Sequence, residues 1–447
     1  MTTHATLKRQ LGLTTAAALV VGEVIGVGIF LTPAGMAKSL GSPALVLAVW
    51  LLMGAMALCG ALCYGELAAR FPAVGGGYVY LREAYGPALA FLYGWMTLLV
   101  VDPGLTAALA VGLASYAGYG LGLPPAALKA TAVAVIFVLA AVNIRGVRLG
   151  AGLVRWLTIL KLGLLMFIVV WGFAGRLGAW ENFAPFGARR AASPPLFGAL
   201  AGALVAGFFS FGGWWDVSKV AGEVRDPART LPRALTYGVL TVTLVYVLTS
   251  AVFVYLVPFE RVASGETFAA QAGAALFGPA GGRVFAAVIV VTVLGSLAVY
   301  LMAAPRVYFA MARDALFFPA VARLHPRFGT PALAIALQAA LAALLVLLGT
   351  FNEIVAYFVF VVVGFVGLTA AAVFVLRRRA PADAARYRTP GYPLTPIIFL
   401  LLIALLLVLL AASNPRQVLL GVGVVALGLP VYYLFFRRRF VSETDER

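Results

Sequence analysis

The chain has 447 residues, of which 63% are hydrophobic and only 11% are charged. Windows of about 20 apolar residues recur along the whole chain, and each is long enough to cross a bilayer. This composition excludes a soluble globular protein, so we predict an all-α polytopic membrane protein.

Twelve transmembrane spans are predicted. They cover residues 13–38, 43–69, 87–120, 125–144, 149–174, 196–221, 231–257, 281–313, 331–350, 352–376, 393–412 and 416–436. If both termini lie on one side, that side holds about 24 of the 33 Lys and Arg residues, and the positive-inside rule assigns it to the cytoplasm. The net charge of +17 is then a topology signal and not a nucleic-acid-binding surface. We expect a multi-pass protein of the inner (plasma) membrane, with no cleaved signal peptide.

Glycines interrupt the first span in the stretch Gly22–Phe30, whose sequence is GEVIGVGIF. In lipid, irregular backbone persists only where it lines a cavity or packs inside protein. A break at residues 25–28 would direct the free amides of one half-helix and the free carbonyls of the other to a single point. Such a point suits the carboxylate and the ammonium of an amino acid. The alternative is a Gly-x-Gly contact for close helix packing.

Residues 72–86 are too polar to span the membrane and predict a short amphipathic helix entered through a glycine turn. Asp102 lies within the apolar third span. An intramembrane carboxylate is a functional candidate, and the alternative is a position near the outer membrane surface.

Lys161, in the fifth span, lies too deep to reach the cytoplasmic surface comfortably. It must find acceptors inside the bundle or lose its proton. The alternative is a lysine neutralised by one carbonyl, with no role in turnover.

The sixth span has a second glycine-interrupted stretch, Phe208–Asp216, with the sequence FFSFGGWWD. Two broken segments in corresponding positions of two halves indicate a transporter built from an inverted repeat, which favours a binding site over a packing motif. The predicted organisation is a cytoplasmic N-terminus (1–12), a first repeat (13–174), a second repeat (196–376), two appended helices (393–436) and a cytoplasmic tail (437–447).

The chain resembles the amino acid–polyamine–organocation (APC) superfamily, and most closely its L-type amino acid transporter-like branch. The matching motifs follow in order along spans 1–10: Ile25–Phe30 (IGVGIF), Pro72–Tyr80 (PAVGGGYVY), Phe211–Trp214 (FGGW) and Ala221–Pro227 (AGEVRDP), with looser matches at Asp102–Gly104 and Arg306–Asp314. The resemblance implies a five-plus-five inverted repeat of the LeuT-like/APC fold, with broken helices 1 and 6, and alternating access.

The resemblance also implies a substrate site. The amides of Val27, Gly28 and Ile29 would hold the substrate carboxylate, and Phe209 would cover the substrate on the outer side. Carbonyls beside the breaks, those of Val24 or Ile25 and of Phe209 and Gly212, would hold the α-ammonium. The full set of substrate-binding candidates is Val24, Ile25, Gly26, Val27, Gly28, Ile29, Phe209, Phe211, Gly212, Gly213 and Trp215.

Lys161 resembles the family lysine that stands where related sodium-coupled carriers bind a cation. Its ammonium would reach the carbonyls of Gly22 and Ile25 and the hydroxyl of Ser296. The candidates for coupling, or for mimicking the cation, are Lys161, Gly22, Ser296 and Glu23.

Three residues depart from the family pattern. Val27 replaces the serine of the commoner Gly-Ser-Gly, which removes a hydroxyl and keeps the amide. Glu23 stands where the family usually has a small or neutral residue. We expect it to pair with Lys161 or carry a proton, and the alternative is a carboxylate that faces a cytoplasmic vestibule. Trp215 stands where relatives often carry Asn or Glu, and it narrows the site.

The predicted function is sodium-independent secondary transport of L-amino acids, with small or medium neutral ones as substrates. A site built from backbone amides and carbonyls suits a zwitterion. The runner-up is a cationic amino acid or polyamine, with Glu23 or Asp216 as the extra carboxylate, and a non-transporting amino-acid sensor is a third alternative. Exchange and proton symport are not distinguished.

An enzyme is not expected, because nucleophile–base pairs and metal ligands are missing at membrane depth. No cofactor or metal is expected either. A channel is disfavoured, since each break occurs once and no filter sequence repeats. Cys59 and Cys63 both lie in the second span, so no disulfide to a partner subunit is expected. A solitary carrier of an amino acid in the lipid bilayer is therefore predicted.

Overall fold

The structure is a computed structural model that describes residues 7–190, 193–258, 268–348, 351–379, 387–413 and 415–437. Within these ranges the chain is helical, and its one β-type pairing is an isolated bridge between Leu11 and Val224. The prediction of an all-α protein is confirmed. From residue 438 onward, the predicted cytoplasmic tail lies outside the described residues.

The helices are listed here with their bounds. They are α1 (Leu13–Val24), α2 (Gly28–Leu40), α3 (Pro43–Arg70), α4 (Gly77–Tyr85), α5 (Pro87–Met96), the π-helix η1 (Thr97–Val101), α6 (Asp102–Leu121), α7 (Pro125–Ile144), α8 (Val147–Ala174), η2 (Trp180–Phe183), α9 (Leu196–Phe211), η3 (Trp214–Glu223), α10 (Pro227–Leu256), α12 (Phe268–Phe277), η4 (Gly278–Ala280), α13 (Gly281–Ala303), α14 (Pro305–Arg313), η5 (Pro319–Ala322), α15 (Ala332–Leu348), α16 (Phe351–Arg379), α17 (Leu394–Ser413), α18 (Pro415–Val431) and the π-helix η7 (Tyr432–Phe436).

Proline marks the first residue of several of these helices, among them Pro43, Pro227 and Pro305. A proline is suited to this place because its fixed φ is helical and the first amide has no partner within the helix. Ten helical segments of the described chain are long and apolar enough to cross a membrane, and α1 with α2 makes an eleventh if the bent pair is one span. α15 is apolar but has only 17 residues. A helix lies at every predicted span, while the number of twelve stays a prediction.

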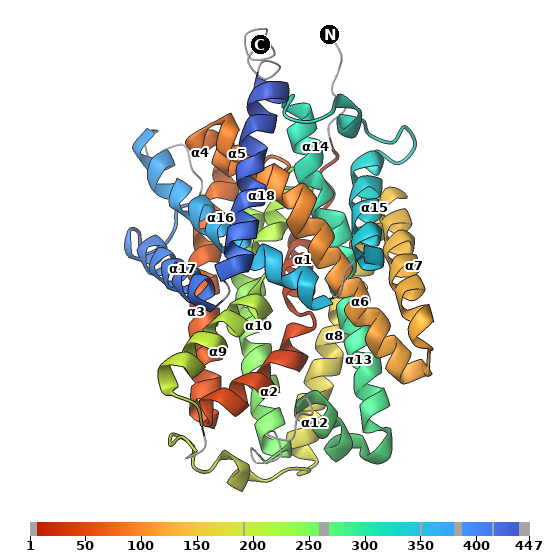
Figure 1. Ribbon diagram of the computed structural model, residues 1–447, viewed down its shortest axis with the longest axis vertical. Coiled ribbons are helices and arrows are strands. Elements are labelled where there is room, and N and C mark those ends of the chain that lie inside the picture. The colour runs from red at the N-terminus through yellow and green to blue at the C-terminus, as the bar shows by residue number, and fades with distance from the viewer. Residues whose placement is uncertain are drawn as a thin grey trace.

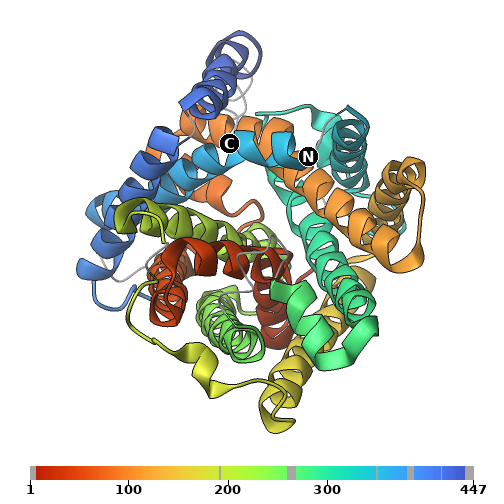
Figure 2. The same cartoon turned by 60° about the horizontal axis from the view of Figure 1, so that its bottom comes forward.

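The first helix lies in the interior of the bundle. α1 packs against α8, α10 and α13, and α10 also packs along α3. α7 and α17 lie at opposite edges of the molecule in both views (Figures 1 and 2). Large apolar side chains such as Phe197, Leu344 and Leu419 are exposed on outer helices, as expected for surfaces that face lipid tails. The break that follows α1 is therefore enclosed by other helices.

Ion pairs join the short helices at the end of the molecule where α18 finishes (Figure 1). Nε of Arg306 on α14 donates to Oε1 of Glu223 at 2.8 Å, and both side chains are buried. Tyr78 on α4 donates to Asp314 at 2.9 Å, and Arg82 pairs with the same carboxylate. Burial raises the pKa of the Tyr78 hydroxyl well above its ordinary value. These contacts tie α4 and η3 to α14 and to the turn after it.

Candidate functional site

The first break separates α1 from α2. α1 ends at Val24, Ile25 leaves the helical conformation with a ψ of 82°, and α2 begins at Gly28. The two helix axes are bent by 45°. In the described part of the chain, the amides of Val27, Gly28 and Ile29 contact no hydrogen-bond acceptor. These three donors stand at the start of α2, where the helix dipole favours an anion.

The second break separates α9 from the 3₁₀-helix η3. α9 ends at Phe211, and Gly212 and Gly213 form the connection. Gly213 has a φ of +105°, which residues with a side chain rarely adopt, and a Cβ atom there would lie 2.8 Å from Cγ of Glu23. Position 213 therefore requires glycine both for its backbone conformation and for the close approach of α1.

The two breaks lie side by side. A Cβ atom on Gly28 would lie 2.9 Å from Cα of Ser210, so the start of α2 touches the backbone of α9. The hydroxyl of Tyr246 on α10 lies 2.8 Å from the carbonyl oxygens of both Val24 and Ser210, and it can donate to either. The broken ends of α1 and α9 thus share one hydrogen-bond donor.

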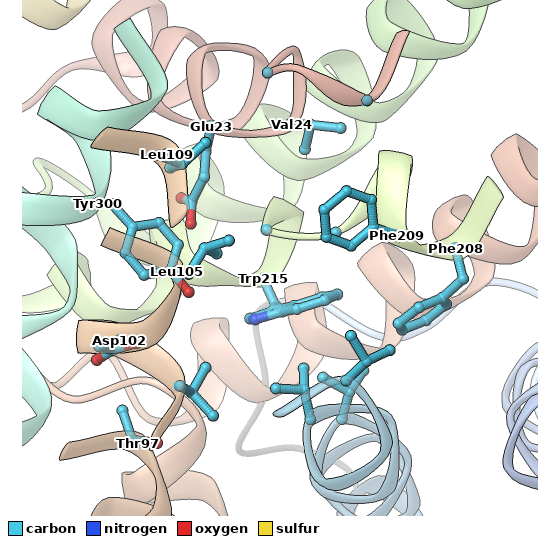
Figure 3. A pocket seen from close by; sticks show the side chains of 18 of the residues that line it. Glu23, Val24, Thr97, Asp102, Leu105, Leu109, Phe208, Phe209, Trp215 and Tyr300 are labelled. Atoms are coloured by element: carbon cyan, nitrogen blue, oxygen red, sulfur yellow. The ribbon is translucent and has the colours of Figure 1, made fainter. Parts of the chain in front are cut away.

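A cavity lies between the breaks. It has about 950 Å³ of space, counting the part that is open to solvent. Figure 3 shows Glu23, Asp102 and Tyr300 on one side of this space, and Phe209 and Trp215 on another. The cavity therefore has a polar region and an aromatic region, as a site for an amphipathic small molecule requires.

Most of the predicted substrate-binding residues line this cavity. They are Val24, Gly26, Val27, Gly28, Phe209, Gly212, Gly213 and Trp215. Ile25, Ile29 and Phe211 are not among its lining residues. The two isoleucines are fully buried, and the ring of Phe211 packs against Trp50 and Tyr246. The side chain of Phe211 therefore belongs to the packed core beside the site.

Of the carbonyls that were expected to hold an α-ammonium, those of Val24 and Ile25 already have partners. The oxygen of Phe209 accepts from the amide of Gly212 at 3.2 Å, and that of Gly212 has no partner in the described part of the chain. The oxygen of Val24 accepts from Tyr246 and from a backbone amide, each at 2.8 Å. The oxygen of Ile25 accepts from Nζ of Lys161 at 2.8 Å and from Oγ of Ser296 at 3.1 Å. Because a carbonyl oxygen has two lone pairs, an ammonium at Val24 or Ile25 would compete with a hydroxyl, that of Tyr246 or of Ser296, which also lies within hydrogen-bond distance of a second carbonyl oxygen.

Lys161 on α8 donates hydrogen bonds to the carbonyls at the C-terminal end of α1. Its Nζ lies 2.7 Å from the oxygen of Gly22, 2.8 Å from that of Ile25 and 3.2 Å from Oγ of Ser296. These are the three partners that the resemblance implied. The side chain is fully buried, and its ammonium satisfies carbonyls that have no partner within the helix. Its role in coupling stays a prediction.

Sequence reasoning missed a buried charged residue at the polar side of the cavity. Nζ of Lys219 lies 3.0 Å from Oδ2 of Asp216 and 3.2 Å from Oδ1 of Asp102. Tyr308 donates to Oδ2 of Asp102 at 2.9 Å. Asp102 is fully buried and lines the cavity, so it belongs to the candidate site, while its depth in the bilayer stays a prediction. The available signal was the three-residue spacing of Asp216 and Lys219, which puts both on one face of a 3₁₀-helix.

Glu23 differs from these paired carboxylates. Its side chain is 6% exposed, and neither oxygen has a hydrogen-bond partner in the described part of the chain. The expected pair with Lys161 is not formed, because that ammonium contacts carbonyls and a hydroxyl instead. Figure 3 shows the carboxyl group of Glu23 directed into the cavity. A buried acid without a partner thus forms part of the cavity wall.

Comparison with known proteins decides the family. The family model described as amino acid permease matches residues 11–436, nearly the whole chain. The chain belongs to the amino acid permease family. This assignment confirms the resemblance to the APC superfamily, and it makes the chain a membrane transporter and not an enzyme.

Relatives of this permease are named as amino acid transporters. The serine/threonine exchanger SteT of Bacillus subtilis (strain 168) is 31% identical over 444 residues, which cover 97% of the permease and 98% of SteT. Asc-type amino acid transporter 1 of Mus musculus is 31% identical over 437 residues, covering 96% of the permease and 81% of that protein. Large neutral amino acids transporter small subunit 2 of Homo sapiens is 30% identical over 433 residues, covering 96% and 80%.

Proposed function

We propose that this permease is a secondary transporter that moves L-amino acids across the plasma membrane by alternating access, without sodium. Small or medium neutral amino acids are the proposed substrates. The names of the three relatives support this class, since they describe a serine/threonine exchanger, an Asc-type amino acid transporter and a subunit of a large neutral amino acid transporter.

The observation that carries the proposal is the meeting of two broken helices at one cavity. The amides of Val27 and Gly28, two cavity-lining residues, have no acceptor in the described part of the chain and offer a carboxylate site at the start of α2. The amide of Ile29 also has no acceptor there, but Ile29 does not line the cavity. Phe209 and Trp215 provide aromatic surface for the rest of the molecule. Backbone donors carry no net charge, so they suit a substrate that is itself neutral overall.

Independence of sodium is supported by Lys161. Its Nζ already contacts the carbonyls of Gly22 and Ile25, so the side chain of Lys161 occupies the end of α1 where a cation would otherwise bind. Ile29 brings no side-chain oxygen to the break, which removes one type of sodium ligand. Exchange and proton symport both remain compatible with this arrangement.

The proposed organisation is an inverted repeat of residues 13–174 and 196–376. In each half the first helix is broken, at 25–27 and at 212–213, which supports this division. Both termini are proposed to lie in the cytoplasm, on the side with the excess of Lys and Arg. We also propose that the permease needs no partner subunit. Its two cysteines, Cys59 and Cys63, both lie within the helix α3, so neither stands in an external loop where it could form a disulfide with a partner.

A second candidate substrate is a cationic amino acid or polyamine. The feature in its favour is Glu23, whose carboxyl group lines the cavity and has no partner among the described residues. A non-transporting sensor would bind the same ligands without moving them, so transport has to be measured directly.

Counterflow in proteoliposomes tests the function. Liposomes loaded with an unlabelled amino acid receive labelled alanine, leucine or arginine outside, and protein-free liposomes serve as the control. We expect alanine or leucine to accumulate without sodium. Accumulation of arginine alone would establish the second candidate. Binding without accumulation of any of the three would identify a sensor.

A further inference from the structure

Glu23 places an uncompensated acid in the cavity wall. Its side chain is 6% exposed, and within the described residues neither of its oxygens makes a hydrogen bond. Its carboxyl group lies against the second break, where a Cβ atom on Gly213 would be 3.2 Å from Oε1. Burying a carboxyl group without a partner is destabilising. A hydrogen-bond donor placed beside Glu23 would therefore stabilise the site.

The two nearby lysines, Lys161 and Lys219, do not donate to Glu23. Lys219 is shared by two carboxylates, Asp102 at 3.2 Å and Asp216 at 3.0 Å. Lys161 bonds to carbonyls and to a hydroxyl. Neither ammonium group therefore donates to Glu23, and its carboxyl group has no charged partner among the described residues. The titratable groups around Glu23 are Asp216 and Lys219 on η3, Asp102 on α6, Tyr93 on α5, Tyr300 on α13, Tyr246 on α10 and Lys161 on α8.

We propose that Glu23 is the receptor for a protonated amine of the transported molecule. An ammonium group would bring a positive charge to the ionised carboxylate and up to three N–H donors. The inference rests on the proposed function and adds the second half of substrate recognition to it. The carbonyls of Val24 and Ile25 each accept from one unshared donor, the amide of Gly26 and Nζ of Lys161, and each also faces a hydroxyl that it shares with another oxygen. An amine at these carbonyls competes with those hydroxyls, whereas both oxygens of Glu23 are without a donor in the described part of the chain. The α-ammonium of a neutral amino acid and the side-chain ammonium of a diamino acid present the same chemistry.

Recognition by Glu23 includes the release of a proton. In the empty cavity the carboxyl group is uncharged, because no donor stabilises an anion there. When an amine enters, the O–H bond of the carboxyl group breaks, the proton passes to water, and the carboxylate oxygen keeps the electron pair that accepts an N–H of the ammonium. Affinity therefore rises with pH, by up to about tenfold per pH unit for one released proton.

Equilibrium binding to the purified full-length permease tests this inference with three ligands. L-alanine carries an α-ammonium only, L-ornithine adds a side-chain ammonium, and L-lactate has the carboxylate without an amine. Glu23→Gln removes the charge and keeps the size of the side chain, whereas Glu23→Asp keeps the charge. Glu181→Gln makes the same chemical change at an exposed position on η2 and is the matched control. Thermal unfolding of each variant shows that it is folded.

We expect Glu23→Gln to bind at least one of the two amines about tenfold or more weakly and to lose the pH dependence. Lactate binding stays as in the wild type, Glu23→Asp recovers part of the affinity, and Glu181→Gln behaves as the wild type. A loss for alanine places the α-ammonium at Glu23, and a loss for ornithine alone places the side-chain ammonium there.

Two results would overturn the inference and leave the proposed function standing. One is equal affinity of the wild type and Glu23→Gln for both amines. The other is a wild-type affinity that does not change with pH, which would mean that no proton is released. By contrast, a wild-type permease that binds and transports no amino acid would refute the proposed function itself.

Discussion

Replacement of Lys161 with methionine removes the ammonium and keeps most of the side-chain volume. In the wild type, Nζ lies 2.7 Å from the oxygen of Gly22 and 2.8 Å from that of Ile25. Oγ of Ser296 lies 2.9 and 3.1 Å from the same two oxygens. Because a hydroxyl has one proton, Ser296 can replace the ammonium at only one of them.

The variant therefore leaves one buried carbonyl with a lost hydrogen bond. Such a loss costs about 1–3 kcal/mol, which corresponds to a factor of about 5 to 150 in the population of the intact break. We expect the initial rate of alanine counterflow to fall by a factor in this range. The variant no longer bears the cost of burying a charged lysine. Its free energy of unfolding is therefore expected to fall by less than the about 1–3 kcal/mol lost at the break.

Counterflow at several external pH values measures this effect. Lys129→Met is the matched control, since Lys129 is exposed and its Nζ donates to a single carbonyl, that of Leu347, at 2.8 Å. We expect the control to transport like the wild type. If Lys161→Met keeps both the rate and the pH dependence of the wild type, Lys161 is a packing residue and the reasoning is refuted.

Three further substitutions test the geometry of the breaks and the buried ion pair. Gly28→Ala adds a Cβ atom 2.9 Å from the backbone of α9, so we expect counterflow to be lost, whereas Gly35→Ala on the same helix meets no atom within 4 Å and keeps wild-type transport. Tyr246→Phe removes the donor shared by both breaks, and thermal unfolding is expected to show a loss of about 1–3 kcal/mol; unchanged stability would mean that the shared donor is dispensable. Glu223→Gln leaves Arg306 buried without its charged partner, which costs about 3–5 kcal/mol. Adding Arg306→Met is expected to restore much of that stability, and a double variant no more stable than Glu223→Gln would contradict the explanation.

The breaks could be predicted from sequence because their cause is local. Neighbouring glycines interrupt the apolar runs at residues 25–28 and 212–213, and the structure places both interruptions there. The partners of Lys161 followed from its depth in the fifth span together with the family resemblance. These inferences needed only the position of a residue along one helix, or a motif already associated with a site.

Other contacts depend on distances in space that the sequence does not contain. Tyr246 is 222 residues from Val24, to which it donates, and Lys219 is 117 residues from Asp102. The depth of Asp102 was open because its helical span, Pro87–Leu121, has 35 residues, whereas about 20 suffice to cross the bilayer. Hydropathy alone does not tell which part of such a span lies at the middle of the membrane.

The hydroxyl of Tyr246 faces two acceptors with a single proton to give. A turn about its C–O bond moves that proton from the oxygen of Val24 to that of Ser210 without displacing any heavy atom. A molecule that bonds to one of these oxygens consequently alters the bonding of the other, on a different helix. Rotation of this one hydroxyl on α10 thus couples the hydrogen bonding at the break of α1 to that at the break of α9.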